Sequence, residues 1–177
     1  MSLSGPKTLV APAPLSITER IGPILSELLG CAEAALDPPV ARAYIAPGNT
    51  VAWDDCCNGQ VWVRLLFLES LALAKMGATH MDPCGLVWTA TFGIGVLRCS
   101  STIDDRGEIA SADALSNEAL QMLADEAALC QAIYCCNVAP LNRYELTRWD
   151  PLGPEGGCVG GEWTMTMQVN NYGCSDT

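Results

Sequence analysis

The sequence predicts an α+β fold in which an antiparallel or mixed β-sheet packs against two α-helices. Two segments, residues 17–36 and 112–136, have apolar side chains at the three-to-four-residue spacing of amphipathic helices. Two others, residues 85–99 and 162–170, alternate large apolar side chains with small or hydroxyl ones, which is typical of strands. The resulting order of helix, strands, helix and strands favours one sheet covered by two helices.

Length and composition indicate a single globular domain. The chain has 177 residues, of which 50% are hydrophobic and 16% charged, so about two-thirds of its unfolded surface can be buried. We expect residues 1–15, rich in Pro, Ser and Ala, to form an extended N-terminal arm and residues 16–177 to form one domain. No apolar run is long enough for a membrane span and no secretion signal is recognisable, so we expect no membrane contact.

The first helix is expected to run from residue 16 to about residue 36. Ser16 and Glu19 have the spacing of a capping box, in which the side chains satisfy free backbone amides. Gly22-Pro23 leaves two alternatives: a helix that kinks there, or a main helix that begins with Pro23 in its first turn. Asp37-Pro38-Pro39 ends the helix, because a residue before proline avoids helical backbone angles.

Strand signals follow this helix. Residues 40–53 form an extended segment interrupted by a turn at residues 47–49. Residues 61–68 have apolar side chains at both odd and even positions, which predicts a strand covered on both faces. The alternative is a helix that continues through Ala74.

The segment of residues 85–99 is the long strand around which we expect the fold to be built. Gly93 and Gly95 within it are expected to mark a bend or a β-bulge. One face of this strand carries the large apolar side chains, namely Leu86, Trp88, Ala90, Phe92, Ile94 and Val96.

The segment of residues 112–136 carries the strongest helical pattern, with Ser116 as its expected N-terminal cap. Its apolar stripe is expected to consist of Leu120, Leu123, Ala127, Cys130 and either Ile133 or Tyr134. Its solvent-facing side is expected to include the acidic residues Glu118, Asp125 and Glu126.

The C-terminal third predicts a hairpin. Residues 142–149 form a short strand, and residues 150–161 form a glycine-rich connecting loop. In the next strand the side chains alternate strictly, so we expect one face buried and one in solvent. The first face is Trp163, Met165, Met167 and Val169, and the second is Glu162, Thr164, Thr166 and Gln168.

The charge balance argues against direct nucleic-acid binding. The formal net charge is −11, and Lys7 and Lys75 are the only lysines, so no basic stripe is available to neutralise phosphates. An acidic surface suits a protein that lets DNA pass without gripping it, because like charges repel.

A search for reactive groups favours a protein that is not an enzyme. The glycine-rich segment of residues 153–161 is followed by a strand and no lysine, so it does not fit a phosphate-binding loop. The carboxylate pairs Asp54-Asp55 and Asp104-Asp105 fall at expected turns. His80 lies near Cys84, but no catalytic signature surrounds them. We therefore expect no catalytic residue and no cofactor.

Ten cysteines are an unusually high number for this length. They are open to three interpretations: small buried hydrophobic residues, disulfides, or a zinc site. The zinc interpretation is weak because the sequence contains no C-x-x-C motif and only one histidine. We therefore expect no metal site, and the sequence does not determine the connectivity of any disulfides.

Several side chains suit a surface that contacts other subunits. Aromatic residues at strand ends belong either to the core or to interfaces, and neutral hydroxyl-bearing strand faces and glycine-rich loops suit subunit contacts as well. The candidate interface residues are Trp163, Thr164, Thr166, Gln168, Thr89, Thr91, Gly156 and Gly157.

Three blocks of the sequence resemble the head-to-tail connector proteins of actinobacteriophages, in particular the tail terminators of long-tailed phages. The resemblance covers roughly residues 16–170. The three blocks are PGNTVAWDDCCNGQVWVRL (residues 47–65), PCGLVWTATFGIGVLRC (residues 83–99) and WDPLGPEGGCVGGEWTMTMQV (residues 149–169).

The resemblance implies a structural virion protein with a tail-terminator-like α+β fold and no catalytic residues. Such a protein forms a ring, expected to be a hexamer, that caps the tail tube and ends its polymerisation. Its implied partners are copies of itself, the tail tube protein and the connector or stopper proteins of the head, while DNA passes through its lumen. Its implied location is the tail or neck of the virion, after assembly in the host cytoplasm.

The resemblance also selects cysteines. The motif cysteines of the family correspond here to Cys56, Cys57, Cys84, Cys99 and Cys158. We add the hypothesis that Cys135-Cys136, at the end of the second helix, reaches Cys56 or Cys57. Alkylation of all ten thiols without reduction would reject it.

Two alternative functions remain open at this point. One is another connector or stopper ring, or a tail tube subunit, of the same virion. The other, which we rank last, is a cysteine-dependent or metal-bearing enzyme.

Overall fold

The computed structural model describes residues 17–70, 88–101, 110–138 and 144–169. The expected arm of residues 1–15 and the cap residue Ser16 therefore lie outside the described residues. The elements in chain order are α1 (Ile17–Ala35), β1 (Arg42–Ile45), the 3₁₀ turn η1 (Cys56–Asn58), β2 (Gln60–Ser70), β3 (Trp88–Cys99), α3 (Ala112–Cys135), β4 (Tyr144–Glu155) and β5 (Cys158–Val169).

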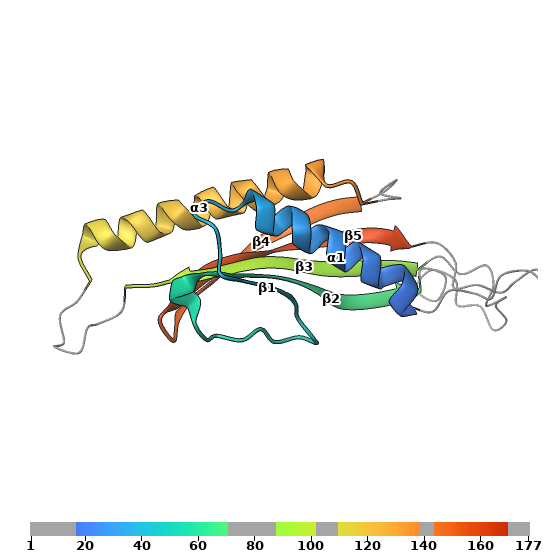
Figure 1. Cartoon of the computed structure of the whole chain (residues 1–177), viewed down its shortest axis with the longest axis horizontal. Helices are drawn as coiled ribbons and strands as arrows, with labels where there is room; N and C mark the ends of the chain where they lie inside the picture. Colours follow the sequence, from blue (N-terminus) through green and yellow to red (C-terminus); the bar gives the residue numbers. More distant parts are fainter. Residues whose placement is uncertain (1–16, 71–87, 102–109, 139–143, 170–177) are drawn as a thin grey trace, which may run out of the picture.

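These elements confirm the predicted α+β fold. The strands form one mixed sheet in the order β1-β2-β3-β5-β4, in which only the β1–β2 pair is parallel. The predicted long strand, β3, lies at the centre of this sheet. Both helices cover the same face of the sheet (Figure 1). Within the described residues, no helix is both long enough and apolar enough to cross a membrane.

Helix α1 is continuous through Pro23, which is exposed. The alternative in which the main helix begins at Pro23 is therefore wrong. The helix is one element from Ile17 to Ala35. Its sheet-facing stripe has the predicted helical spacing, so each turn contributes apolar side chains to the core. The buried residues of this stripe are Ile21, Ile24, Leu25, Leu28 and Ala32.

Strand β2 confirms the strand interpretation of the segment with apolar residues at both parities. Val61 and Val63 point toward the helices, whereas Trp62 points to the opposite face, and all three are fully buried. The strand continues to Ser70, and the alternative of a helix through Ala74 falls outside the described residues. A small second cluster covers the opposite face around Trp62, formed by Ala46, Cys56, Trp62, Leu97 and Cys158.

The expected bulge at Gly93 and Gly95 is absent from β3. The register with β5 is unbroken along the whole strand, and the irregularity with β2 lies between Leu65 and Phe67 of the partner strand. Glycine is required here for a different reason. A Cβ atom at Gly95 would collide with the Trp62 ring, so the missing side chain leaves room for that ring.

Helix α3 has the predicted length but presents the opposite face to the sheet. Its buried residues are Asp125, Leu129, Ala132 and Ile133. Of the predicted stripe, Leu120, Leu123, Ala127 and Tyr134 are therefore exposed, whereas Ile133, the alternative to Tyr134, lies in the core. The helix also begins earlier than its expected cap. The Ser111 hydroxyl accepts a 3.1 Å hydrogen bond from the Ala114 amide, whereas Ser116 lies inside the helix.

The β4–β5 hairpin contains less loop than expected. Strand β4 continues to Glu155 and β5 begins at Cys158, so most of residues 150–161 is strand, with a tight turn at Gly156-Gly157. Both turn glycines have positive φ, 58° and 79°, which side-chain-bearing residues rarely adopt. The segment is therefore part of the sheet.

Candidate functional site

Five of the eight candidate interface residues lie together on the sheet face that is turned away from the helices. Thr89 pairs with Gln168, Thr91 pairs with Thr166, and Thr164 follows on β5. The Thr91 and Thr166 hydroxyl oxygens are 3.5 Å apart. Phe67 of β2 pairs with Thr91 on the same face and is 58% exposed. We call Phe67, Thr89, Thr91, Thr164, Thr166 and Gln168 the hydroxyl face.

The other three candidates lie elsewhere. Trp163 points toward the helices, where its indole Nε1 donates a 3.0 Å hydrogen bond to the Glu126 carbonyl and its ring packs 5.9 Å from that of Trp149. Gly156 and Gly157 form the hairpin turn, beyond the far end of the β3–β5 ladder from Thr89. The structure thus brings Trp163 into the core rather than onto the hydroxyl face.

A buried ion pair borders the hydroxyl face and was not predicted. Arg64 donates to both Glu162 carboxylate oxygens, from Nε at 2.9 Å and from an amino nitrogen at 2.7 Å. The Trp62 indole also donates to Glu162, at 2.6 Å. Glu162 was expected in solvent but is only 7% exposed, because β2 supplies these three donors and Gly93 leaves space for the carboxylate. A buried pair of this kind fixes the positions of β2 and β5 across β3.

The side of α3 that faces away from the sheet carries the apolar residues that the sequence analysis expected in the core. Leu120, Leu123 and Tyr134 are 64%, 55% and 60% exposed, and Ala127 between them is exposed as well. We call these four residues the apolar stripe. They recur at helical spacing from Leu120 to Tyr134, over roughly 21 Å. An exposed apolar row of this length is typical of an interaction site.

A second ion pair explains why α3 turns this stripe outward. Arg98 of β3 donates to both carboxylate oxygens of Asp125, at 2.6 and 2.9 Å, and also to the Pro38 carbonyl at 2.8 Å. Asp125 is 2% exposed, although the helical pattern placed it in solvent. With Asp125 held against the sheet, the stripe on the opposite side of the helix must face outward.

The N-terminal half of α3 is also anchored through Glu118. Its carboxylate accepts hydrogen bonds from the Ser101 amide at 2.5 Å and from the Ser100 hydroxyl at 3.2 Å. Partial burial raises the pKa of Glu118, but the hydrogen bonds from Ser101 and Ser100 favour the charged form and lower the pKa overall. This contact joins the end of β3 to α3.

Within the described residues, three disulfides link the helices, the sheet and η1. They are Cys31–Cys136, Cys56–Cys158 and Cys57–Cys99. The hypothesis that Cys135-Cys136 reaches Cys56 or Cys57 is wrong, because the end of α3 packs beside α1 and not over η1. Cys135 is a free, exposed thiol, and the candidate Cys84 lies outside the described residues.

Two of the disulfides lie side by side at one end of the sheet. Cys99 and Cys158 are paired residues of β3 and β5, and the adjacent Cys56 and Cys57 of η1 bind one each. A cavity of about 230 Å³ next to them is lined by Asp55, Ser100, Gly156 and Gly157 together with these four cysteines. Because all four sulfurs are bonded, the group is a cross-link between the turn and the sheet.

The remaining reactive candidates have ordinary structural roles where they are described. Asp54 forms an exposed ion pair with Arg42 at 2.9 Å, and Asp55 accepts a 2.7 Å hydrogen bond from the Asn58 amide. His80 and Asp104-Asp105 lie outside the described residues. Burial, together with the neighbouring Glu126, raises the pKa of the free Cys130 thiol, which disfavours the nucleophilic thiolate.

The fold and these contacts define an α+β protein that is cross-linked by disulfides and has two unlike outer surfaces, the hydroxyl face and the apolar stripe. No protein family model matches the chain, and no curated protein is significantly similar to it.

Proposed function

We propose that this chain is a structural virion protein, a tail terminator whose copies form a ring on the end of the tail tube. The ring ends tube polymerisation and joins the tail to the connector proteins of the head. The proposal rests on the resemblance of the three sequence blocks and on the surfaces described above.

The observation that carries the proposal is the pair of unlike outer surfaces. Both helices lie on one face of the sheet (Figure 1). The exposed side chains of the apolar stripe lie on the side of α3 away from the sheet, and the hydroxyl face lies on the other face of the sheet. A ring needs a heterologous interface, in which two different patches of each subunit meet between neighbours. We infer that the apolar stripe of one copy packs on the hydroxyl face of the next, where the exposed Phe67 supplies apolar area.

Burial provides the driving force for such a contact. Leu120, Leu123 and Tyr134 are each more than half exposed in the single chain, and fully burying a large apolar side chain stabilises by roughly 1.5–3 kcal/mol. The hydroxyls of Thr91, Thr164 and Thr166 carry no charge and can donate or accept hydrogen bonds, whereas the Thr89 hydroxyl is buried. Two exposed carboxylates, Glu69 beside Thr89 and Glu145 beside Thr166, lie at the edges of this face, so the contact is expected to leave them in solvent at its rim.

The formal charge of −11 supports a passage for DNA through the ring. An acidic lumen repels phosphates, so DNA would pass without binding. Six copies is the number that the resemblance implies.

Mass photometry of the purified full chain tests the proposal. A terminator is expected to give a discrete species of six 18.8 kDa chains, about 113 kDa. Open filaments would instead identify a tube subunit, and a compact monomer at high concentration would contradict any ring. In the virus, deletion of this protein is expected to give tails of variable, increased length, because polymerisation of the tube no longer ends at a fixed point. Tails of unchanged length would contradict the terminator function.

A matched pair of variants links the assembly to the surface. Leu120→Glu combined with Leu123→Glu places charge on the apolar stripe and is expected to leave monomers. Asn117→Glu adds one negative charge at an exposed position of α3 outside the stripe, and it is expected to leave the ring intact. Equal assembly of both variants would show that the stripe is not an interface.

A further inference from the structure

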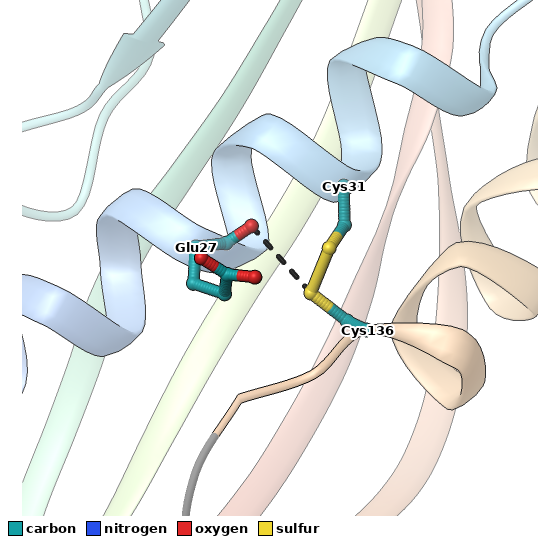
Figure 2. A group of neighbouring side chains, drawn as sticks. All are labelled: Glu27, Cys31 and Cys136. Carbon is teal, nitrogen blue, oxygen red and sulfur yellow. Dashed lines mark hydrogen bonds between the residues drawn. A yellow bond between two sulfur atoms is a disulfide. The ribbon is translucent and has the colours of Figure 1, made fainter.

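Three potential metal ligands converge between the two helices. Glu27 and Cys31 lie one turn apart on α1, and Cys136 directly follows the last residue of α3 (Figure 2). One ligand atom from each lies within 4.8 Å of the other two, and no other group of three such ligands occurs in the described part of the chain. In the oxidised chain, Cys31 and Cys136 are joined as a disulfide.

Reduction of this disulfide would produce two cysteine thiols that can bind a metal ion as thiolates. Two thiolates and a carboxylate are three ligands of the kind that Zn²⁺ binds tetrahedrally, with a water in the fourth position. Zinc–sulfur bonds of about 2.3 Å hold the two sulfurs roughly 3.8 Å apart. The Cα atoms are 5.8 Å apart, so rotation of the cysteine side chains reaches this spacing without moving the helices.

The local charge favours a cation at this position. Helix α3 ends at Cys135 and has no basic residue in its last turn, so its free carbonyl groups give its C-terminus a partial negative charge. The Glu27 carbonyl also lies at the site, 3.5 Å from the Cys136 sulfur.

The two cysteines of the site line a cavity, and Glu27 is exposed beside them. A cavity of about 430 Å³ adjoins the disulfide and is lined by Cys31, Cys135, Cys136 and Gln131, with alanines of both helices completing its wall. A reductant and a hydrated metal ion can therefore reach the two sulfurs from solvent.

We propose that reduction of the Cys31–Cys136 disulfide creates a zinc site formed by the two cysteine thiolates and the Glu27 carboxylate. With a phosphine as reductant, the S–S bond breaks, and the phosphorus is oxidised to a phosphine oxide that takes its oxygen from water. The two water protons give two thiols, and Zn²⁺ then displaces both protons. The α1–α3 link is thus covalent in the oxidised chain and metal-mediated in the reduced chain, which goes beyond the proposed function.

Zinc titration of the reduced full chain, followed by native mass spectrometry, tests the site. We expect one zinc at this site in the reduced chain and none there in the oxidised chain. Glu27→Gln is expected to weaken the affinity about tenfold or more, as loss of a supporting group at a metal site does. Glu33→Gln is the matched control, because Glu33 is exposed on the same helix outside the group.

A second pair of variants excludes the other cysteines and does not depend on Glu27. The double variant Cys31→Ser, Cys136→Ser is expected to lose the bound zinc. The double variant Cys57→Ser, Cys99→Ser has the same number of thiols and is expected to keep it. The site is overturned if the reduced chain binds no zinc, if the first double variant keeps it, or if Glu27→Gln and Glu33→Gln bind equally tightly.

Discussion

The Glu162 carboxylate packs directly against the backbone of Gly93. A Cβ atom at Gly93 would lie 2.7 Å from the Glu162 carboxyl carbon. The Glu162 carboxylate is held there by Arg64 and Trp62, so it cannot move aside without losing hydrogen bonds. We expect Gly93→Ala to lower the free energy of unfolding by about 1–3 kcal/mol, the usual cost of overpacking. Chemical denaturation measures the change.

Gly30 provides the control for this substitution. It lies in α1, is exposed, and an added Cβ would meet nothing within 4 Å. Gly30→Ala is therefore expected to stabilise the chain by up to about 1 kcal/mol, because alanine favours helix more than glycine does. Equal effects of Gly30→Ala and Gly93→Ala would contradict the close approach of Glu162 to β3.

The buried ion pair predicts a second, larger effect. Glu162→Ala leaves the Arg64 charge and the Trp62 indole without their partner, and we expect a loss of about 3–5 kcal/mol. Asp150→Ala breaks the Arg148–Asp150 pair, whose side chains are 72% and 41% exposed, and is expected to cost less than about 1 kcal/mol. Similar losses in urea denaturation of the two variants would show that Arg64 and Glu162 are not buried together.

The disulfides make a prediction for thiol labelling. In the described part of the chain six cysteines are bonded, so alkylation of the oxidised, denatured chain is expected to label at most the other four: Cys84, Cys130, Cys135 and Cys174. Peptide mapping should find Cys31 linked to Cys136, and labelling of either cysteine without reduction would contradict this pairing. Because Cys31 and Cys136 are 105 residues apart, loss of this disulfide is expected to cost about 2–5 kcal/mol.

Glu118 predicts a pH-dependent contribution to stability. Its pKa is below its unfolded value near 4.5, so the carboxylate stabilises the fold above that pH. This stabilisation is lost as the pH falls through the folded pKa. We expect the difference in melting temperature between the native chain and Glu118→Gln to be present at about pH 7 and to vanish in acid.

Ser100 provides the comparison for Glu118. Ser100→Ala removes one hydrogen-bond donor to the Glu118 carboxylate, so it is expected to reduce the pH-dependent difference. A difference between the native chain and Glu118→Gln that stays constant from neutral to acidic pH would contradict the assignment.

The strands could be predicted from the sequence because their alternation is local. Met165 and Met167 are buried and Gln168 is exposed, as the period of two required. The prediction that Glu162 faces solvent was wrong. Glu162 lies on the expected face of β5, but side chains from β2 cover it. Local patterns specify the face on which a side chain lies, but they do not specify what covers that face.

The orientation of α3 and the cysteine pairs depend on distant parts of the chain. Helix α3 has apolar residues on both sides, Leu120 on one and Leu129 on the other, so periodicity alone could select either. Arg98 decides between them by pairing with Asp125. Cys56 pairs with Cys158 across 102 residues, and such a pairing becomes evident only once β5 is placed beside β3.

The most direct test of the ring is to mix two variants, each blocked on one surface. Leu120→Glu with Leu123→Glu blocks the apolar stripe, and Phe67→Glu with Gln168→Glu blocks the hydroxyl face. In analytical ultracentrifugation each variant alone is expected to remain an 18.8 kDa monomer. Their mixture is expected to form a dimer of about 38 kDa, because one intact surface of each kind remains. A mixture that stays monomeric, or a variant that assembles alone, would contradict a ring built from these two surfaces.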